Sequence, residues 1–358
     1  MSKKIKIGSN FISLEDPTYF IADIAANWDG SLERAKDLIY LAAEMGANAA
    51  KFQNFNAGTI VSDYGFKKLN NGKQLSHQKK WSESVFEVYK KASLPIGWTE
   101  DLKNTCIKAG IDYFTAPYDE NQIEKLSKHV LAWKVGSGDI TWVQIIEKLS
   151  KYNLPILIAT GASTQEEVET AYKAAKKFND KIIIMQCNTN YTASLENFKY
   201  VNLNVLKTFK LNFPEAILGL SDHTPGHSTV LGAVTLGARV IEKHFTDDNN
   251  REGPDHKFSM NPKDWRLMVD HTRELESALG GEIKKIEDNE KETFIIQRRA
   301  IRATKDLQPN TIIQKDNLTF LRPCPIESLK PSQINMILNK KVKKKIKKGD
   351  IIRIDDLF

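Results

Sequence analysis

Residues 217–245 read ILGLSDHTPGHSTVLGAVTLGARVIEKHF. An apolar run at 217–222 leads into a helical pattern at 228–237, and a second apolar run follows at 239–245. Strands that are apolar throughout and alternate with helices are typical of a parallel sheet covered by those helices. This stretch therefore predicts a strand–helix–strand unit in which both strands end in polar residues.

The same alternation extends over the first three quarters of the chain. Eight candidate strands can be counted, at 19–26, 49–55, 112–117, 132–138, 155–160, 181–188, 217–222 and 239–245. Eight strand–helix units in about 250 residues fit a (β/α)8 TIM barrel. An open doubly wound sheet is the alternative, but no GxGxxG motif follows the first strand. The sequence predicts an α/β protein with a TIM barrel over residues 1–281.

The remaining residues contain a duplication. A charged linker is expected at 282–296, followed by a small β-rich domain at 297–358. Residues 305–318 (KDLQPNTIIQKDNL) and 344–357 (KKIKKGDIIRIDDL) share five identities in 14 aligned positions. Both copies carry turn-forming residues at the same place. Each copy is predicted to form a strand, a turn and a second strand, which gives a pseudo-symmetric domain.

The composition limits which binding partners and which cellular location are expected. Hydrophobic residues make up 41% and charged residues 27% of the chain, as in ordinary folded proteins. No run of about 18 apolar residues is present, so we expect no membrane partner. The N-terminus lacks the apolar stretch of a secretory signal, and the cysteines form no CxxC pair, which predicts a cytoplasmic location. The three cysteines are Cys106, Cys187 and Cys324.

The net charge is +7, and seven lysines lie within residues 340–348. A basic run of this kind can bind nucleic acid. Aromatic residues do not interleave with these lysines, as a base-stacking surface would require. We therefore expect a solvated face and no nucleic-acid partner.

Polar residues gather at the ends of the predicted strands. In a TIM barrel, the carboxyl ends of the strands form the active site. Any one such residue could belong to a structural ion pair or a capped loop, but their joint occurrence predicts a site. The candidates are Asp23, Asn27, Lys51, Gln53, Lys134, Ser137, Asp139, Tyr191, Ser221, Asp222, His223, Glu242, Lys243 and His244.

His223 and His244 close two neighbouring strands at matching positions. Two imidazoles with a few oxygens can hold Mn²⁺, Fe²⁺ or Zn²⁺, and we expect no thiolate nearby that would favour zinc. Two protein ligands leave open positions for water and substrate, as a Lewis-acid site needs. The pair predicts a divalent metal site.

Lys51 and Lys134 are expected in the same mouth, without paired acids beside them in sequence. Two ammonium groups can cradle a phosphate or carboxylate. A Schiff-base lysine is the rival role, because an aldolase also uses a lysine on a barrel strand. A neighbouring metal site favours the anion cradle.

Residues 56–100 are too long for an ordinary strand–helix loop. An insertion at the carboxyl end of a barrel strand is expected to form a lid or a substrate wall. A plain surface excursion is the alternative.

Seven segments are characteristic when taken together: IADIAANWDGS (21–31), KFQNF (51–55), KVGSGDIT (134–141), ATG (159–161), GLSDHT (219–224), EKHFTDD (242–248) and GPDHKFSMNP (253–262). With these segments the chain resembles the sialic acid synthase family, which includes pseudaminic and legionaminic acid synthases. The C-terminal duplication is similar to the antifreeze-like (SAF) domain that this family carries.

The resemblance implies condensation of phosphoenolpyruvate with an N-acylated hexosamine, either N-acetylmannosamine or a diacetamido hexose. The products would be a nine-carbon 2-keto-3-deoxy acid and phosphate, released by C–O cleavage. A divalent metal is implied at His223 and His244, with Mn²⁺ first and Mg²⁺ or Co²⁺ as alternatives. Arg322 would reach a neighbouring subunit's site, which implies a domain-swapped homodimer.

The resemblance also implies roles for the other candidates. Asp23 is expected to assist the attacking water. The implied phosphoenolpyruvate contacts are Lys51, Lys134, Ser137 and Ser221, and the implied sugar-side residues are Gln53, Asp139, Tyr191 and Asp255, with Asn27 as a further substrate contact.

Some positions depart from the family pattern. Asp23 and Asp139 stand where glutamate is usual, and Ala159 and Thr189 also differ. Each shorter acid withdraws its carboxylate by about 1.5 Å, one C–C bond. Two other functions are compatible with the sequence: a phosphoenolpyruvate-dependent synthase of another 2-keto-3-deoxy sugar acid, and a non-catalytic sugar-binding homologue.

Overall fold

The computed structural model describes residues 3–69 and 76–358. The chain divides into two compact units, Met1–Gly280 and Gly281–Phe358. Among the described residues, no helix combines the length and the apolar character needed to cross a membrane.

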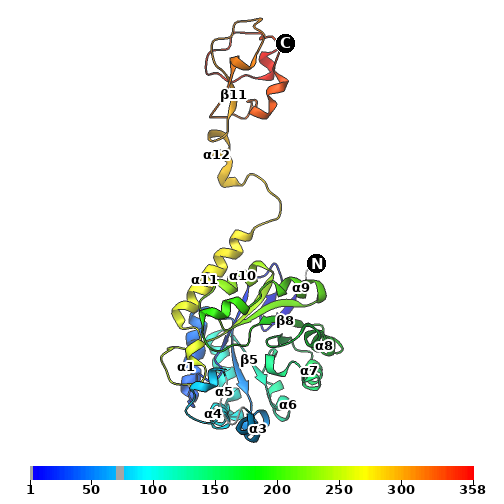
Figure 1. Ribbon diagram of the computed structural model, residues 1–358, viewed down its shortest axis with the longest axis vertical. Coiled ribbons are helices and arrows are strands. Elements are labelled where there is room, and N and C mark those ends of the chain that lie inside the picture. The colour runs from blue at the N-terminus through cyan, green and yellow to red at the C-terminus, as the bar shows by residue number, and fades with distance from the viewer. Residues whose placement is uncertain (1–2, 70–75) are drawn as a thin grey trace. The chain divides into compact units, whose positions relative to one another are not determined.

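The first unit is a closed barrel of eight parallel strands, which confirms the predicted TIM barrel (Figure 1). Nearly every strand residue is buried, because the barrel interior covers one side and the helices cover the other. Going round the barrel, the order is β10-β3-β4-β5-β6-β7-β8-β9. The strands are β3 (Tyr19–Asp23), β4 (Ala49–Asn54), β5 (Asp112–Pro117), β6 (Trp133–Val135), β7 (Ile156–Ala159), β8 (Ile182–Cys187), β9 (Ile217–Asp222) and β10 (Ala238–His244).

Helices surround the barrel (Figure 1). Ser31 caps α1 by accepting a hydrogen bond from the Arg34 amide, and Thr164 forms a capping box with Glu167 on α8. Each cap stabilises its helix by about 1 kcal/mol. The outer helices are α1 (Leu32–Glu44), α5 (Thr99–Ala109), α6 (Ile123–Ser127), α7 (Val143–Ser150), α8 (Gln165–Lys176), α9 (Val205–Asn212), α10 (Ser228–Thr235) and α11 (Pro262–Leu279).

An antiparallel hairpin precedes the barrel, formed by β1 (Ile5–Ile7) and β2 (Asn10–Ile12). The Asn10 amide donates to Asp112 at 2.9 Å, which places the hairpin at the amino end of β5. Its strands of three residues are too short to show a periodic pattern, so the sequence did not predict them.

The predicted insertion lies between β4 and α5. It contains α2 (Ala57–Ile60), α3 (Asp63–Lys68), α4 (Val85–Ala92) and two 3₁₀ helices, Ser76–Lys80 and Ile96–Trp98. Residues 70–75 of the insertion lie outside the described part of the chain.

The second unit contains α12 (Lys291–Ile296), β11 (Ala300–Ala303) and β12 (Leu318–Leu321). The helix falls within the stretch expected to be a linker. The two repeat copies have the same local structure, but the second strand expected at the end of each copy is a 3₁₀ helix, Lys315–Asn317 or Ile354–Asp356, followed by the extended residue Leu318 or Leu357. Short polar runs that hydrogen-bond to their own backbone favour such turns over strands.

The two copies pair with each other about a pseudo-two-fold axis. Leu307 and Ile346 exchange both backbone hydrogen bonds, at 2.8 and 3.0 Å. The Asn310 amide donates to Val342, and the equivalent Gly349 amide donates to Ala303. Asn310 and Gly349 both have positive φ, 70° and 87°. The duplication in sequence is thus a duplication in structure.

Candidate active site

A chain of buried charges crosses the mouth of the barrel. The Lys51 ammonium lies 2.6 Å from Asp23 Oδ2 and 3.9 Å from Glu242 Oε1. The same Glu242 oxygen lies 3.1 Å from the Lys134 ammonium and accepts a hydrogen bond from Ser221. No acid lies beside either lysine in sequence. The paired acids come from other strands, which the neighbouring sequence does not reveal.

The pairing of Asp23 with Lys51 shifts the pKa of both groups. Burial alone would raise the pKa of Asp23, but Lys51 and His244 hold that pKa below its usual value. Burial acts to lower the pKa of Lys51, and the carboxylates of Asp23 and Glu242 hold it above its usual value. A Schiff-base lysine must be a free amine to attack. The charged state of Lys51 therefore favours the anion cradle.

His223 and His244 meet at the matching ends of β9 and β10. Their ring centroids are 5.4 Å apart. His223 Nδ1 lies 3.1 Å from the carbonyl oxygen of Asn188, which leaves its Nε2 for another partner. Burial lowers the pKa of His244 to about 3, so this ring is a neutral imidazole. The two side chains converge, as the strand register predicts.

The histidines fit the metal site that was predicted from two protein ligands. His244 Nε2 lies 3.6 Å from Asp23 Oδ2, and its buried Nδ1 has no hydrogen-bond partner in the described structure. Neutral imidazole nitrogens are common ligands of Mn²⁺, Fe²⁺ and Zn²⁺. Within residues 3–69 and 76–358, no group of three or more His, Cys, Asp or Glu side chains is arranged to hold a metal. Water and substrate oxygens would have to complete the coordination.

A thiol lies beside the histidines, contrary to expectation. Burial would raise the pKa of Cys187, but a hydrogen bond with His223 lowers it. Cys187 ends β8, which neighbours β9 in the barrel. A nearby soft sulfur makes Zn²⁺ a stronger competitor for this site than the sequence suggested.

The loops after β6, β7 and β8 meet in close contact. Ser137 Oγ accepts a hydrogen bond from the Gly161 amide at 3.0 Å. A Cβ atom on Gly161 would lie 1.8 Å from Thr189 Oγ1 and 2.9 Å from Ser137 Oγ. Only glycine fits here without a shift of its neighbours. Ser137, a predicted phosphoenolpyruvate contact, is thereby fixed beside the mouth.

The sugar-side candidates include two carboxylic acids that are weaker than usual, Asp139 and Asp255. The Gln53 amide donates to Asp23 at 3.2 Å, and Asp255 accepts from the Ala26 amide at 3.1 Å. Burial raises the pKa of Asp139 and of Asp255 to about 6. Carboxyl groups that titrate near neutral pH can donate or accept a proton toward a sugar hydroxyl.

Two further candidates lie elsewhere. Asn27 is fully buried, and its amide donates to the Phe245 carbonyl and to Ser259. These bonds join the loops after β3 and β10, so Asn27 supports the wall of the mouth. Arg322 is an exposed residue of the second unit. The predicted substrate contacts of both residues stay predictions.

The insertion forms one wall of a large cavity above the histidines, and this agrees with the expected substrate wall. Tyr191 lies 4.5 Å from His223 between ring centroids, and His77 of the insertion lies 5.0 Å from Tyr191. Trp81 follows at 5.4 Å from His77. These aromatic residues line a cavity of about 1080 Å³, which we call the outer chamber.

Sequence reasoning left three of these residues out of the candidate site and gave a fourth, Glu242, no role. Glu242 was among the polar residues at the predicted strand ends. It precedes His244 by two positions, and side chains two apart share one face of a strand. Cys187 likewise ends a predicted strand. His77 and Trp81 had no signal, since nothing in a loop sequence tells which side chains face the site.

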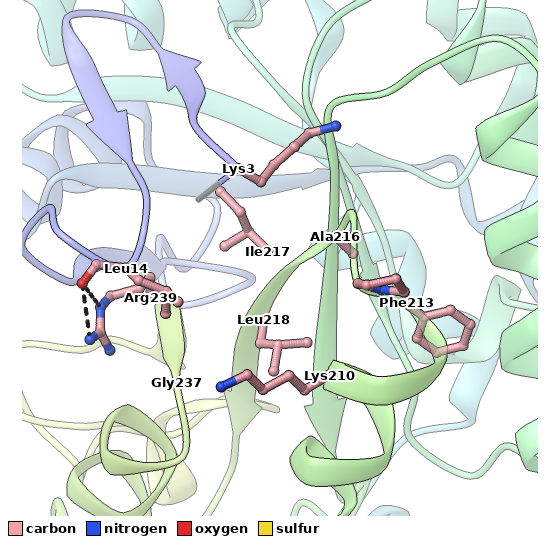
Figure 2. A pocket seen from close by; sticks show the side chains of 10 residues that line it. Lys3, Leu14, Lys210, Phe213, Ala216, Ile217, Leu218, Gly237 and Arg239 are labelled. Atoms are coloured by element: carbon pink, nitrogen blue, oxygen red, sulfur yellow. Dashed lines mark hydrogen bonds between the residues drawn. The ribbon is translucent and has the colours of Figure 1, made fainter. Parts of the chain in front are cut away.

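A second, smaller cavity of about 190 Å³ lies at the opposite, amino end of β9 and β10. Figure 2 shows three cationic side chains on its wall, from Lys3, Lys210 and Arg239. The Arg239 guanidinium turns to the Leu14 carbonyl at 3.3 Å, and the two ammonium groups point elsewhere (Figure 2). The three cations do not converge on one ligand position.

Comparisons with known proteins agree with this architecture. The NeuB family model matches residues 38–284, and the SAF domain model matches residues 298–357. The chain is 33% identical to N,N'-diacetyllegionaminic acid synthase of Campylobacter jejuni, over 94% of this chain and 99% of that protein. It is 29% identical to human N-acetylneuraminate-9-phosphate synthase, over 94% of this chain and 92% of that protein.

A solved structure gives the same result. The crystal structure of N-acetylneuraminic acid synthetase from Leptospira borgpetersenii is similar with a TM-score of 0.70 at 28% identity, covering 82% of this chain and 95% of that one. The family model covers more than half of the chain. The resemblance seen in the sequence is confirmed: this chain belongs to the NeuB family and carries a SAF domain at its C-terminal end.

Proposed function

We propose that this protein condenses phosphoenolpyruvate with the open-chain aldehyde of an N-acylated hexosamine. C3 of phosphoenolpyruvate attacks the aldehyde carbon, and water adds at C2. The hemiketal phosphate then expels phosphate by C–O cleavage. One phosphoenolpyruvate, one sugar and one water give a nine-carbon 2-keto-3-deoxy acid and phosphate.

The observation that carries the proposal is the buried charge chain in the mouth. The Lys51 and Lys134 amines lie 3.9 and 3.1 Å from one carboxylate oxygen, that of Glu242. Two buried ammonium groups suit a substrate with both a phosphate and a carboxylate. Fixing that substrate beside the acceptor removes much of the entropic barrier to the reaction.

The remaining residues have roles that follow from their contacts. Asp23 lies between Lys51 and Gln53 and would orient the attacking water and accept its proton. An anion that draws Lys51 away from Asp23 would raise the basicity of Asp23. Asp139 and Asp255 would hold sugar hydroxyls.

A divalent cation held by His223 and His244 would supply Lewis-acid polarisation of the aldehyde. We propose Mn²⁺, with Mg²⁺ and Co²⁺ as alternatives. The buried charges in the mouth of the barrel come from two acids and two lysines, so as a set they balance. A trianionic substrate adds negative charge that a cation would offset.

The test is phosphate release with phosphoenolpyruvate, Mn²⁺ and a set of N-acyl and diacetamido hexoses. Phosphoenolpyruvate labelled with ¹⁸O at its bridging oxygen should give labelled phosphate, because the C–O bond breaks. Unlabelled phosphate would exclude this chemistry. Sugar binding without any phosphate release would instead support a non-catalytic homologue.

A further inference from the structure

The wall of the barrel contains a buried ion pair that the proposed reaction does not use. The Lys243 ammonium lies 2.5 Å from Asp222 Oδ2, and each side chain is 2% exposed. In sequence Asp222 directly precedes His223, and Lys243 directly precedes His244. Successive side chains of a strand point to opposite faces. The ion pair therefore lies behind the two histidines, toward the helices, where Asp222 accepts a hydrogen bond from Thr229 of α10 at 2.7 Å.

The ion pair joins β9 and β10 at the place where their pairing ends. Asp222 and Lys243 are the last partners in the register of these two strands, and β9 ends at Asp222. Their side chains add a further bond between the strands, one residue before both histidines. The rings of His223 and His244, with centroids 5.4 Å apart, are carried by the strand ends that this bond joins.

The same two side chains hold the chain that follows His223. The Lys243 ammonium donates to the Thr224 carbonyl at 2.6 Å. Asp222 accepts from the Thr224 amide at 3.1 Å and from the Thr224 hydroxyl at 2.9 Å. The backbone is therefore bound on both sides of His223, while Nδ1 of its ring contacts the Asn188 carbonyl.

Stability alone does not require charges at these two positions. A buried ion pair can often be replaced by uncharged groups of similar volume with little loss of stability. Hydrogen bonds to charged groups are shorter and roughly twice as strong as those between neutral groups. Such bonds suit the support of a metal site, because the ligands must be held within about 0.5 Å of their working positions.

From this placement we infer that Asp222 and Lys243 are positioning residues, which hold His223 and His244 at the separation that a divalent cation requires. The inference rests on the proposed function, because it concerns the metal site of that proposal. In this role neither side chain touches the metal or the substrate.

Lys243→Met, Asp222→Asn and the double variant test the inference. Each single variant leaves one buried charge without its partner, so it should lower both the stability of the metal-free protein and its affinity for Mn²⁺. The double variant leaves no unpaired charge and should recover most of the stability. Its Mn²⁺ affinity should stay about 10–100-fold below that of the wild-type protein, the range found for residues behind a metal ligand.

Urea denaturation measures the stability, and electron paramagnetic resonance measures the Mn²⁺ binding that His244→Ala abolishes. Tyr19→Phe is the matched control, because it removes a buried hydrogen bond of 2.7 Å to Asp112 at the amino end of the barrel. This variant should lose stability and keep the Mn²⁺ affinity of the wild-type protein.

An Mn²⁺ affinity that recovers together with the stability in the double variant would overturn the inference, because the ion pair would then only support the fold. A similar loss of Mn²⁺ affinity in Tyr19→Phe would also overturn it, as would a wild-type protein without Mn²⁺ binding that depends on His244. A failure of the proposed function looks different: no sugar then supports phosphate release, and the Mn²⁺ affinities still decide the inference.

Discussion

The Lys134 ammonium and the Glu242 carboxylate lie 3.1 Å apart, although β6 and β10 stand on opposite sides of the barrel. Their ion pair spans the mouth. Both side chains are at most 5% exposed, so little water screens the pair. Glu242 is the carboxylate paired with Lys134, and it also lies 3.9 Å from Lys51.

Glu242→Gln should therefore destabilise the fold. Removing one partner of a buried ion pair leaves an uncompensated charge and costs about 3 kcal/mol. Urea denaturation measures the loss of unfolding free energy. Inorganic phosphate should restore part of that free energy by binding the ammonium groups that have lost the Glu242 carboxylate. Glu87→Gln removes a surface pair with Lys90 at 3.5 Å and should cost less than about 0.5 kcal/mol. Equal losses for the two variants would contradict a stabilising role for the pair.

His244→Ala should remove metal binding and turnover while the barrel stays folded. The expected loss of Mn²⁺ affinity is more than about 100-fold, since even residues behind a ligand change affinity by about 10–100-fold. Mn²⁺ titration followed by electron paramagnetic resonance gives the affinity, and circular dichroism monitors the fold. His271→Ala, at a histidine pair on the outer helices, is the control. Turnover that persists in a chelator would rule out the metal.

Asp139→Asn should stabilise the protein near neutral pH. The folded pKa is about 6 and the ordinary value is 3.8, so the folded state binds more protons between these values. Stability then falls as the pH rises from about 4 to 6, and the full penalty remains above pH 6. The asparagine side chain cannot ionise, so the substitution should raise the free energy of unfolding by about 1–2 kcal/mol. Solvent screening makes this gain smaller than the roughly 3 kcal/mol that corresponds to the pKa shift of Asp139 without screening.

Thermal unfolding near pH 7.5 and near pH 5 checks the Asp139 prediction, with the gain larger at the higher pH. Asp355→Asn, at an exposed residue of the second unit, should leave both transitions in place. A gain that is equal at the two pH values would argue against titration of Asp139 as the cause.

Gly161→Ala should weaken phosphoenolpyruvate binding and cost about 1–3 kcal/mol of stability, because the new methyl overlaps Thr189 and Ser137. KM for phosphoenolpyruvate and chemical denaturation are the measurements. Adding Thr189→Ala should recover part of both losses. Gly97→Ala, where nothing lies within 4 Å of a new Cβ, should be harmless. No recovery in the double variant would show that the contact is not the cause.

Arg322→Ala should raise KM for the sugar with a smaller change in kcat, if the second unit completes a neighbouring subunit's site. Mixing the inactive His244→Ala protein with the Arg322→Ala protein, at a sugar concentration below the KM of the latter, then tests the domain-swapped homodimer. Mixed dimers contain one intact site and should restore part of the activity. If the activity of the mixture is only the sum of the activities of the two separate proteins, the exchange of C-terminal units between subunits is contradicted.

The barrel could be predicted because each of its strands is a buried apolar run, and such runs are visible locally. The bounds at 112–117 and 217–222 match the structure. The strand expected at 132–138 ends at Val135, because Ser137–Asp139 form a 3₁₀ turn. The apolar pattern therefore placed the end of this strand too far along the chain, because turn-forming residues follow it directly.

The site was only partly predictable, for a geometric reason. The convergence of His223 and His244 follows from their matching positions on neighbouring strands. The pairs of Lys51 with Asp23 and of Lys134 with Glu242 depend on which strands face each other across a closed barrel. The order of the strands in the sequence does not show which strands face each other. That becomes known only once the strands are closed into a barrel.

The self-pairing of the two C-terminal copies has a consequence for how this gene can vary. Leu307 and Ile346 occupy equivalent environments, and each completes the other's half of the core. Because both side chains belong to one core, a substitution at either position changes the packing of both halves. A change in one copy therefore restricts which changes the other copy can accept.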